Sequence, residues 1–156
     1  MKSTLFTFLS AVAMILFCTG CSENKAGAAA SGEQAFVTAY RTALESSDTK
    51  TLDSFFMADG TPAEVVEFFK MMREIPAGTK LVDVKLESPT AEERARFDKA
   101  MPMPDGKSYK LAVSPTKKLV VTMKSDGPNG NSTSTSTLPV AEKDGKFIIP
   151  LPVPAA

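Results

Sequence analysis

Hydrophobic residues recur at helical spacing in the part of the chain that follows residue 30. In the segment 31–48, apolar side chains stand three or four positions apart, and Ser31 with Gln34 forms a capping box at its start. The apolar face of this first helix consists of Phe36, Tyr40, Ala43 and Leu44. The spacing predicts a helix of about four turns with one buried side.

Two shorter helices are predicted before residue 79. Asp48 or Thr49 provides an N-cap for the first of them. Its inward side chains are Leu52, Phe55 and Phe56. The second begins in TPAE (61–64), which combines an N-cap threonine, a proline at the first helical position and a glutamate three residues after the cap. Its predicted buried side chains are Val65, Phe68, Phe69 and Met72.

The period then changes from helical to alternating. In KLVDVKLES (80–88), apolar side chains alternate with charged ones, which is typical of a strand with one solvent-exposed face. The residues expected to point inward are Val82, Val84 and Leu86. Thr90 and Glu93 then cap a brief, mostly polar helix, AEERARFDKA.

Four strands are expected from residue 108 onward: YKLAV, KKLVVTMK, STSTSTLPVAE and KFIIP. The turns between them contain proline, glycine or aspartate, and Asp144-Gly145 is the strongest hairpin signal. These strands predict an antiparallel meander. Helices first and strands after indicate an α+β domain, with the N-terminal helices packed on one face of a curved antiparallel sheet.

The N-terminus has the layout of a bacterial secretory signal peptide. One lysine precedes an uncharged run, residues 3–22, whose apolar centre LFTFLSAVAMILF is shorter than the roughly 20 residues that span a bilayer. Thr19 and Gly20 precede Cys21, and this resembles the lipobox of bacterial lipoproteins, in which the signal is cut just before a cysteine that carries the lipid. The resemblance implies a signal peptide at 1–20 and a lipid anchor on Cys21.

An ordinary secretory signal is the alternative, with cleavage after the small residues of 26–28 or 28–30 and a soluble periplasmic product. Cys18 leaves with the signal under either hypothesis, so we expect no disulfide within one mature chain. Ser22, directly after Cys21, is not the aspartate that resembles an inner-membrane retention signal. We therefore expect a protein of the bacterial cell envelope, anchored in the outer membrane and facing the periplasm.

Composition limits the chemistry of the rest of the chain. Residues 21–30 are small and polar and are predicted to form a flexible tether to a folded domain at 31–150. Of 18 basic side chains, Lys2 leaves with the signal, so 17 remain against 18 acidic ones, which argues against nucleic acid as a partner. The chain has no histidine, which excludes Ser-His-Asp triads and imidazole zinc sites. We expect no cofactor and no metal.

Two segments resemble the nuclear transport factor 2-like superfamily. FVTAYRTALESSDTKTLDSFF (36–56) is similar to its opening, where a helix, a short polar break and a second small helix precede a cone of antiparallel strands. VAEKDGKFII (140–149) is similar to its last hairpin, where a glycine turn precedes an aromatic residue. The resemblance implies a concave sheet closed by helices around a pocket, in a superfamily that hosts both enzymes and binding modules.

We therefore expect a ligand-binding or protein-interaction module. Its expected partners are the membrane, through Cys21, and a small ligand, an envelope protein or a second copy of the chain. The pocket that the resemblance implies is expected to be lined by Phe36, Tyr40, Phe68 and Phe69. These aromatic side chains are equally suited to a plain core.

A small isomerase-like enzyme that needs no metal is the alternative function. Such an enzyme uses an aspartate base and a tyrosine hydrogen-bond donor. The chain offers Asp53, Asp83, Tyr40 and Tyr109 for these roles. Asp83 lies on the polar side of its predicted strand and Asp53 follows a core leucine in a helix, so both carboxylates are expected to face solvent.

Three further segments allow a specific and a general interpretation. Met101 and Met103 have thioethers that can bind Cu(I), but they lie in a Pro-rich loop without an identifiable third ligand. Serine and threonine alternate at 132–137, which favours an exposed edge strand over a binding surface for a polar ligand or an added strand. The Pro-rich tail at 151–156 is expected to run extended as a trailing end.

Overall fold

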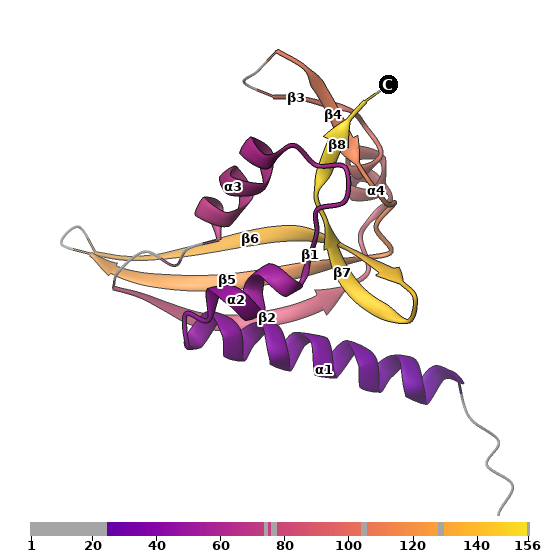
Figure 1. Cartoon of the computed structure of the whole chain (residues 1–156). Helices are drawn as coiled ribbons and strands as arrows, with labels where there is room; N and C mark the ends of the chain where they lie inside the picture. The colour runs from indigo at the N-terminus through magenta and orange to yellow at the C-terminus, as the bar shows by residue number, and fades with distance from the viewer. Residues whose placement is uncertain (1–24, 74, 76–77, 104–105, 128–129, 156) are drawn as a thin grey trace, which may run out of the picture.

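The computed structural model describes residues 25–73, 75, 78–103, 106–127 and 130–155. Helices come mostly first and strands mostly after, as Figure 1 shows, so the predicted α+β class is confirmed. In chain order the elements are α1 (Lys25–Glu45), α2 (Thr49–Ser54), β1 (Phe56–Met57), α3 (Ala63–Met72), β2 (Thr79–Glu87), α4 (Ala91–Phe97), β3 (Met101–Pro102), β4 (Ser108–Leu111), β5 (Lys117–Gly127), β6 (Gly130–Lys143), β7 (Lys146–Pro150) and β8 (Pro152–Pro154).

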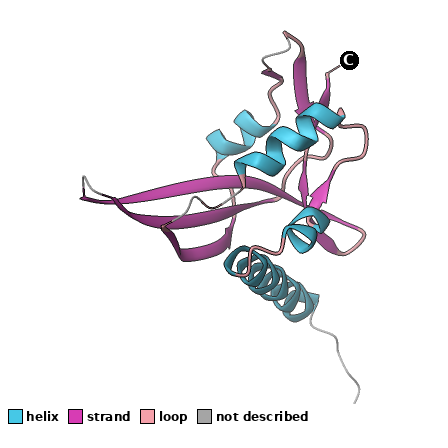
Figure 2. Cartoon of the chain, turned by 60° about the vertical axis from the view of Figure 1, so that its left-hand side comes forward, coloured by secondary structure: helices cyan, strands magenta, loops and turns pink. Residues whose placement is uncertain are grey.

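The main sheet has five strands in the order β1-β7-β6-β5-β2. β5, β6 and β7 form an antiparallel meander, and Asp144 and Gly145 make its second turn with positive φ angles of 52° and 73°. β2 pairs antiparallel with β5, whereas the short β1 pairs parallel with β7. The sheet is therefore mixed rather than purely antiparallel, and it is curved and open (Figure 2).

β4 departs from the predicted meander. It pairs with β3 and β8 in a separate three-stranded sheet, and β2 lies beside β5 instead. Ladder length explains the difference: β2 pairs with β5 from Thr79 to Glu87, whereas β4 has only four residues. β4 is stabilised instead by burial of apolar surface in the second sheet, where its residue Tyr109 is completely buried.

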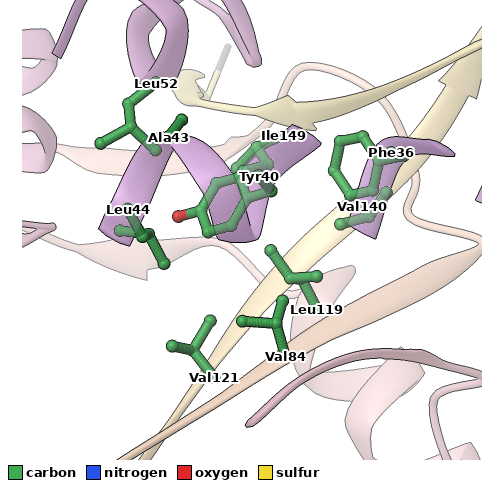
Figure 3. Close-up of a cluster of buried hydrophobic side chains, with 10 residues drawn as sticks. All are labelled: Phe36, Tyr40, Ala43, Leu44, Leu52, Val84, Leu119, Val121, Val140 and Ile149. Atoms are coloured by element: carbon green, nitrogen blue, oxygen red, sulfur yellow. The ribbon is translucent and has the colours of Figure 1, made fainter. Parts of the chain in front are cut away.

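The core lies between α1 and the concave face of the main sheet (Figure 3). Phe36, Tyr40 and Leu44 follow one another at intervals of four residues on α1, so they share one side of the helix. They meet Leu119 and Val121, which point to the same side of β5. The other buried members of the cluster are Ala43, Leu52, Val84, Val140 and Ile149. The predicted apolar face of the first helix is confirmed.

α1 begins at Lys25, earlier than predicted. Residues 25–30, expected to belong to the tether, are helical. Four of these six residues are alanine, which has the highest intrinsic helix propensity of the amino acids, and this explains the extension. Ser31 consequently lies inside the helix, so the helix does not begin at the predicted capping box. The predicted signal peptide and Cys21 lie outside the described residues.

β2 contains a bulge that changes which of its residues face inward. The pairing with β5 is irregular between Leu81 and Asp83, which leaves Val82 as the extra residue. Val82 was expected to be buried but is 51% exposed, and Leu81 packs against the core instead. Val84 and Leu86 keep their predicted inward positions. Alternation alone does not show where such an extra residue falls.

The Pro-rich tail is part of the packed structure, so the expected trailing end is wrong. Pro152–Pro154 forms β8 and pairs with β4. Leu151 is completely buried, and its N–H donates to the carbonyl oxygen of Met57 at 3.0 Å. Proline lacks an N–H and is tolerated in strands at sheet edges, which is where β8 lies.

Truncating the centre of the core should destabilise the domain strongly. Leu119 is completely buried on β5, so Leu119→Ala should lower the free energy of unfolding by about 2–5 kcal/mol. Val82→Ala is the matched control, because this exposed bulge residue should cost less than about 1 kcal/mol. Urea unfolding followed by circular dichroism measures both values. Equal losses for the two variants would contradict the assignment of Leu119 to the core.

Candidate functional site

A cavity of about 250 Å³ opens between α1, α3 and the concave face of the main sheet. Its apolar lining consists of Tyr40, Leu44, Phe56, Phe69, Met72, Ile75, Val121, Met123 and Leu138. Its polar lining consists of Arg73, Ser136 and Thr137. Ligand pockets are typically apolar with a few placed polar groups, and this cavity has that character at a volume just below the usual size range.

Helix and strand periods bring the cavity walls together. Tyr40 and Leu44 are one turn apart on α1 and point to the same side. Val121 and Met123 are two residues apart on β5, so they too share a face. Ser136 pairs directly with Val121 across the ladder and therefore extends that face onto β6 with a small side chain. The hydroxyl group of Ser136 makes this part of the otherwise apolar cavity wall polar.

α3 supplies the remaining wall. Phe69 and Met72 stand three positions apart near the end of this helix and line the cavity together with Arg73. Met72 is 68% exposed, so it lies at the rim. Methionine is flexible and polarizable, which suits Met72 and Met123 to adapt to ligands of different shape.

Arg73 places a buried positive charge in the cavity wall. Its side chain is 8% exposed and forms an ion pair with the carboxylate of Asp53 on α2. Its guanidinium also lies 5.5 Å from the centre of the Phe56 ring and donates to the carbonyl oxygen of Thr49 at 3.4 Å. The positive charge is thus balanced within the wall, and its position is fixed from three sides.

Tyr40 contributes a hydroxyl group that stays protonated. Burial raises the pKa of Tyr40 to about 12, and the positive charge of Arg73 acts weakly in the opposite direction. A protonated phenol can both donate and accept a hydrogen bond. Tyr40 and Arg73 therefore give one part of an otherwise apolar cavity the means to bind a hydrogen-bond acceptor.

The four predicted pocket residues are divided between cavity, core and surface. Tyr40 and Phe69 line the cavity. Phe36 belongs to the core at the other end of the cluster, with ring-centre distances of 5.3 Å to Phe55 and 5.8 Å to Phe147. Phe68 is 39% exposed and stacks edge-on against Phe69 at 5.7 Å.

Sequence reasoning missed Arg73, Phe56 and Ser136 as lining residues. Arg73 directly follows α3 in a segment without apolar period, and only the pairing with Asp53 reveals its role. Ser136 lies in a uniform Ser/Thr run, and nothing in that run distinguishes the residue that pairs with Val121. Cross-strand register is the signal that would have identified it.

The residues of the alternative enzyme hypothesis do not meet in this cavity. Asp83 accepts a hydrogen bond from Arg41 at 3.1 Å across an open groove between α1 and β2. Asp53 pairs with Arg73 behind the wall, and Tyr109 is buried in the second sheet. Neither carboxylate is among the residues that line the cavity beside Tyr40.

The groove between α1 and β2 is larger, about 590 Å³, but its chemistry is different. Its charged residues include Glu33, Arg41, Asp83 and Lys85. Arg41 and Lys85 both pair with Asp83, at 3.1 Å each, and Glu33 pairs with Lys117 at 2.9 Å. These groups satisfy one another, so the smaller apolar cavity is the better candidate site.

The described residues contain neither a cluster of metal ligands nor a membrane-spanning helix. Across these residues, no three His, Cys, Asp or Glu side chains lie together in a way that could hold a metal ion. Met101 belongs to the short β3 and is 37% exposed, away from the cavity lining. Within the described part of the chain, no helix has the length and apolar character to cross a bilayer.

Comparisons with known proteins add no assignment. A scan against protein-family models, a search of curated proteins and a search of solved structures each find no match to this chain. The function has to be inferred from the chemistry of the cavity.

Replacing the cavity hydroxyl should change how stability depends on pH. A tyrosine with a raised folded-state pKa contributes stability below about pH 10, and that contribution is lost as pH rises toward 12. The loss amounts to about 2–3 kcal/mol over this interval, and Tyr40→Phe should not show it. Urea unfolding of both proteins at pH 9 and at pH 12 measures the difference. Parallel losses in the two proteins would show that Tyr40 is not buried as described.

Proposed function

We propose that this chain is a lipid-anchored protein of the bacterial cell envelope whose domain binds a small apolar ligand. The observation that carries the proposal is the cavity of about 250 Å³ between α1, α3 and the main sheet. Its walls are mainly apolar, and a well-packed core leaves few voids larger than a water molecule. A cavity with methionine at its rim and in its wall is suited to a ligand that enters and leaves.

The wall chemistry indicates which ligands fit. An alkyl chain or a single ring matches the volume and the apolar lining, including Val121, Met123 and Leu138. A carbonyl or carboxylate oxygen on the ligand can accept a hydrogen bond from Tyr40, with the Arg73 guanidinium nearby. The proposed ligand is therefore a short amphiphile with an oxygen acceptor at one end.

The proposed anchor, Cys21, precedes the start of α1 in the sequence, whereas the cavity is lined by residues from the second half of this helix. Tyr40 is 15 residues after the start of this helix at Lys25, which at 1.5 Å per residue corresponds to roughly 22 Å. Figure 1 shows the start of α1 on the side away from α3. With Cys21 in the membrane, the cavity would be held off the lipid surface, where it can take a ligand from the periplasm.

We also propose a relationship to the nuclear transport factor 2-like superfamily. The support consists of a long helix followed by a short one, a curved sheet ending in the β6–β7 hairpin, and a cavity between the helices and the concave face. The separate sheet of β3, β4 and β8 is an addition to that arrangement. The relationship bears on the fold and assigns no reaction.

Filling the cavity should abolish ligand binding. Ser136→Phe places a ring in the cavity, so the affinity of residues 22–156 for octanoate should fall about tenfold or more in isothermal titration calorimetry. Ser132→Phe is the matched control, because Ser132 lies further along the same face, outside the cavity lining, and should leave the affinity unchanged. Binding by the wild type should have a negative heat-capacity change. Octanoate binding that Ser136→Phe leaves intact would refute the site.

Lipidation of Cys21 can be tested separately. In the bacterial host, the wild-type chain should incorporate a labelled palmitate and fractionate with the outer membrane. Cys21→Ser should lose the label and retain its signal peptide, which mass spectrometry of the intact chain detects. A soluble wild-type protein that begins near residue 29 or 31 would instead support the ordinary secretory signal.

A further inference from the structure

Half of β6 has a neighbouring strand on one side only. β6 pairs with β5 from Gly130 to Val140, but β7 pairs only with Ala141–Lys143. Residues 131–137 therefore form an edge of the main sheet within the described part of the chain, and all seven are exposed. Figures 1 and 2 show this part of the β5–β6 hairpin extending as an arm away from the helices.

The outward backbone groups of this edge can be assigned from the register. The β5–β6 ladder begins at the pair Gly127 and Gly130, which flanks the hairpin loop, and it continues without irregularity. The pair that flanks a two-residue loop is hydrogen-bonded, and bonded and non-bonded pairs alternate along an antiparallel ladder. Thr133, Thr135 and Thr137 consequently turn their N–H and C=O groups away from β5.

This edge lacks the features that normally prevent strand pairing. Sheet edges in monomeric proteins are usually protected by charged residues, prolines or bulges. From Gly130 to Leu138 there is no charged side chain and no proline, and the pairing with β5 shows no bulge. The opposite edge of the same sheet, β2, has the bulge at Val82 together with Lys80 and Lys85.

We infer that the edge at residues 131–137 pairs with the same edge of a second copy of this chain. The two β6 strands would run antiparallel across a two-fold axis, which makes one continuous sheet. Because serine and threonine alternate, a pairing centred on Thr133 sets Thr133 opposite its own copy and Ser132 opposite Ser134. No like charges oppose each other in this register.

Pairing between two copies is favoured over growth of a fibre, because the β2 edge of the sheet is protected against further pairing. Once the two β6 edges pair, the long edges that remain exposed belong to β2 of each copy, where the bulge and the lysines oppose further addition. The contact uses the same surface on both copies and closes as a dimer.

α3 adds apolar surface beside this edge. Met72 is 68% exposed and lines the cavity together with Ser136 and Thr137 of β6. A strand added along β6 would approach Met72 and remove part of its side chain from water, which favours association. The dimer does not depend on the proposed ligand, since its contacts are made by backbone groups of β6.

A cysteine cross-link in the native membrane tests the inference. The full chain carrying Thr133→Cys, expressed in its own host, should give a reducible dimer on mild oxidation with copper-phenanthroline. Thr122→Cys is the matched control on β5. In the dimer its two copies would lie three strand spacings apart across the sheet, a separation of at least about 14 Å, beyond the roughly 7 Å between Cα atoms that a disulfide allows. The chain without an added cysteine should give no dimer.

Blocking the edge should then remove the cross-link. Adding Thr135→Pro removes only an outward N–H, so the ladder with β5 should persist while the dimer yield falls about tenfold; Thr135→Val should keep the full yield. If the proline variant does not accumulate as folded protein, Thr135→Lys tests the same edge by charge repulsion. Absence of a dimer with Thr133→Cys, an undiminished yield in both blocking variants, or a cross-link to a different protein would overturn the inference.

Discussion

The packing of one face of α1 on the centre of the main sheet determines the rest of the structure. Phe36, Tyr40 and Leu44 cover Leu119 and Val121, and without this contact neither the helix nor the sheet would have a buried side. Figure 3 shows these side chains meeting between the helix and the strands. Because the contact fixes α1 over β5, it also fixes where α2, β1 and α3 can follow in the chain.

The cavity results from a mismatch between the two packed surfaces. On β5 the apolar positions continue from Leu119 to Met123, whereas on β6 they end at Leu138 and the next inward position is Ser136. A serine opposite Val121 leaves space that a larger apolar side chain would fill. The same change from apolar to Ser/Thr residues leaves the outer half of β6 without a core to cover. The cavity and the free edge therefore have one origin in the sequence.

Local patterns in the sequence were sufficient for most elements and insufficient for their arrangement. Helical spacing located the buried face of α1, and Thr90 with Glu93 forms the predicted capping box at α4, with hydrogen bonds of 2.7 and 3.2 Å. Strand order was less accessible, because pairing of β2 with β5 depends on a long-range contact that no local pattern encodes. The bulge at Val82 and the burial of Leu151 were missed for the same reason. Each depends on which strand lies alongside.

The candidate site was predictable only in part, for a related physical reason. Tyr40 and Phe69 are aromatic residues on predicted buried helix faces, so helical spacing alone brings them toward the sheet. Arg73 and Ser136 enter the cavity through an ion pair with Asp53 and through cross-strand register, both of which exist only in the folded chain. Phe36 was selected on the same grounds as Tyr40 but lies at the end of α1 where the core is filled.

We propose that the mismatch between α1 and the main sheet leaves a cavity that holds a small apolar molecule. Native mass spectrometry of the mature protein, purified gently from its own host, tests this proposal most directly. We expect a bound species of low mass that dissociates with little activation and that is absent from the Ser136→Phe variant. Wild-type protein whose mass is that of the mature chain and its covalent modifications alone, as in the variant, would contradict the proposal.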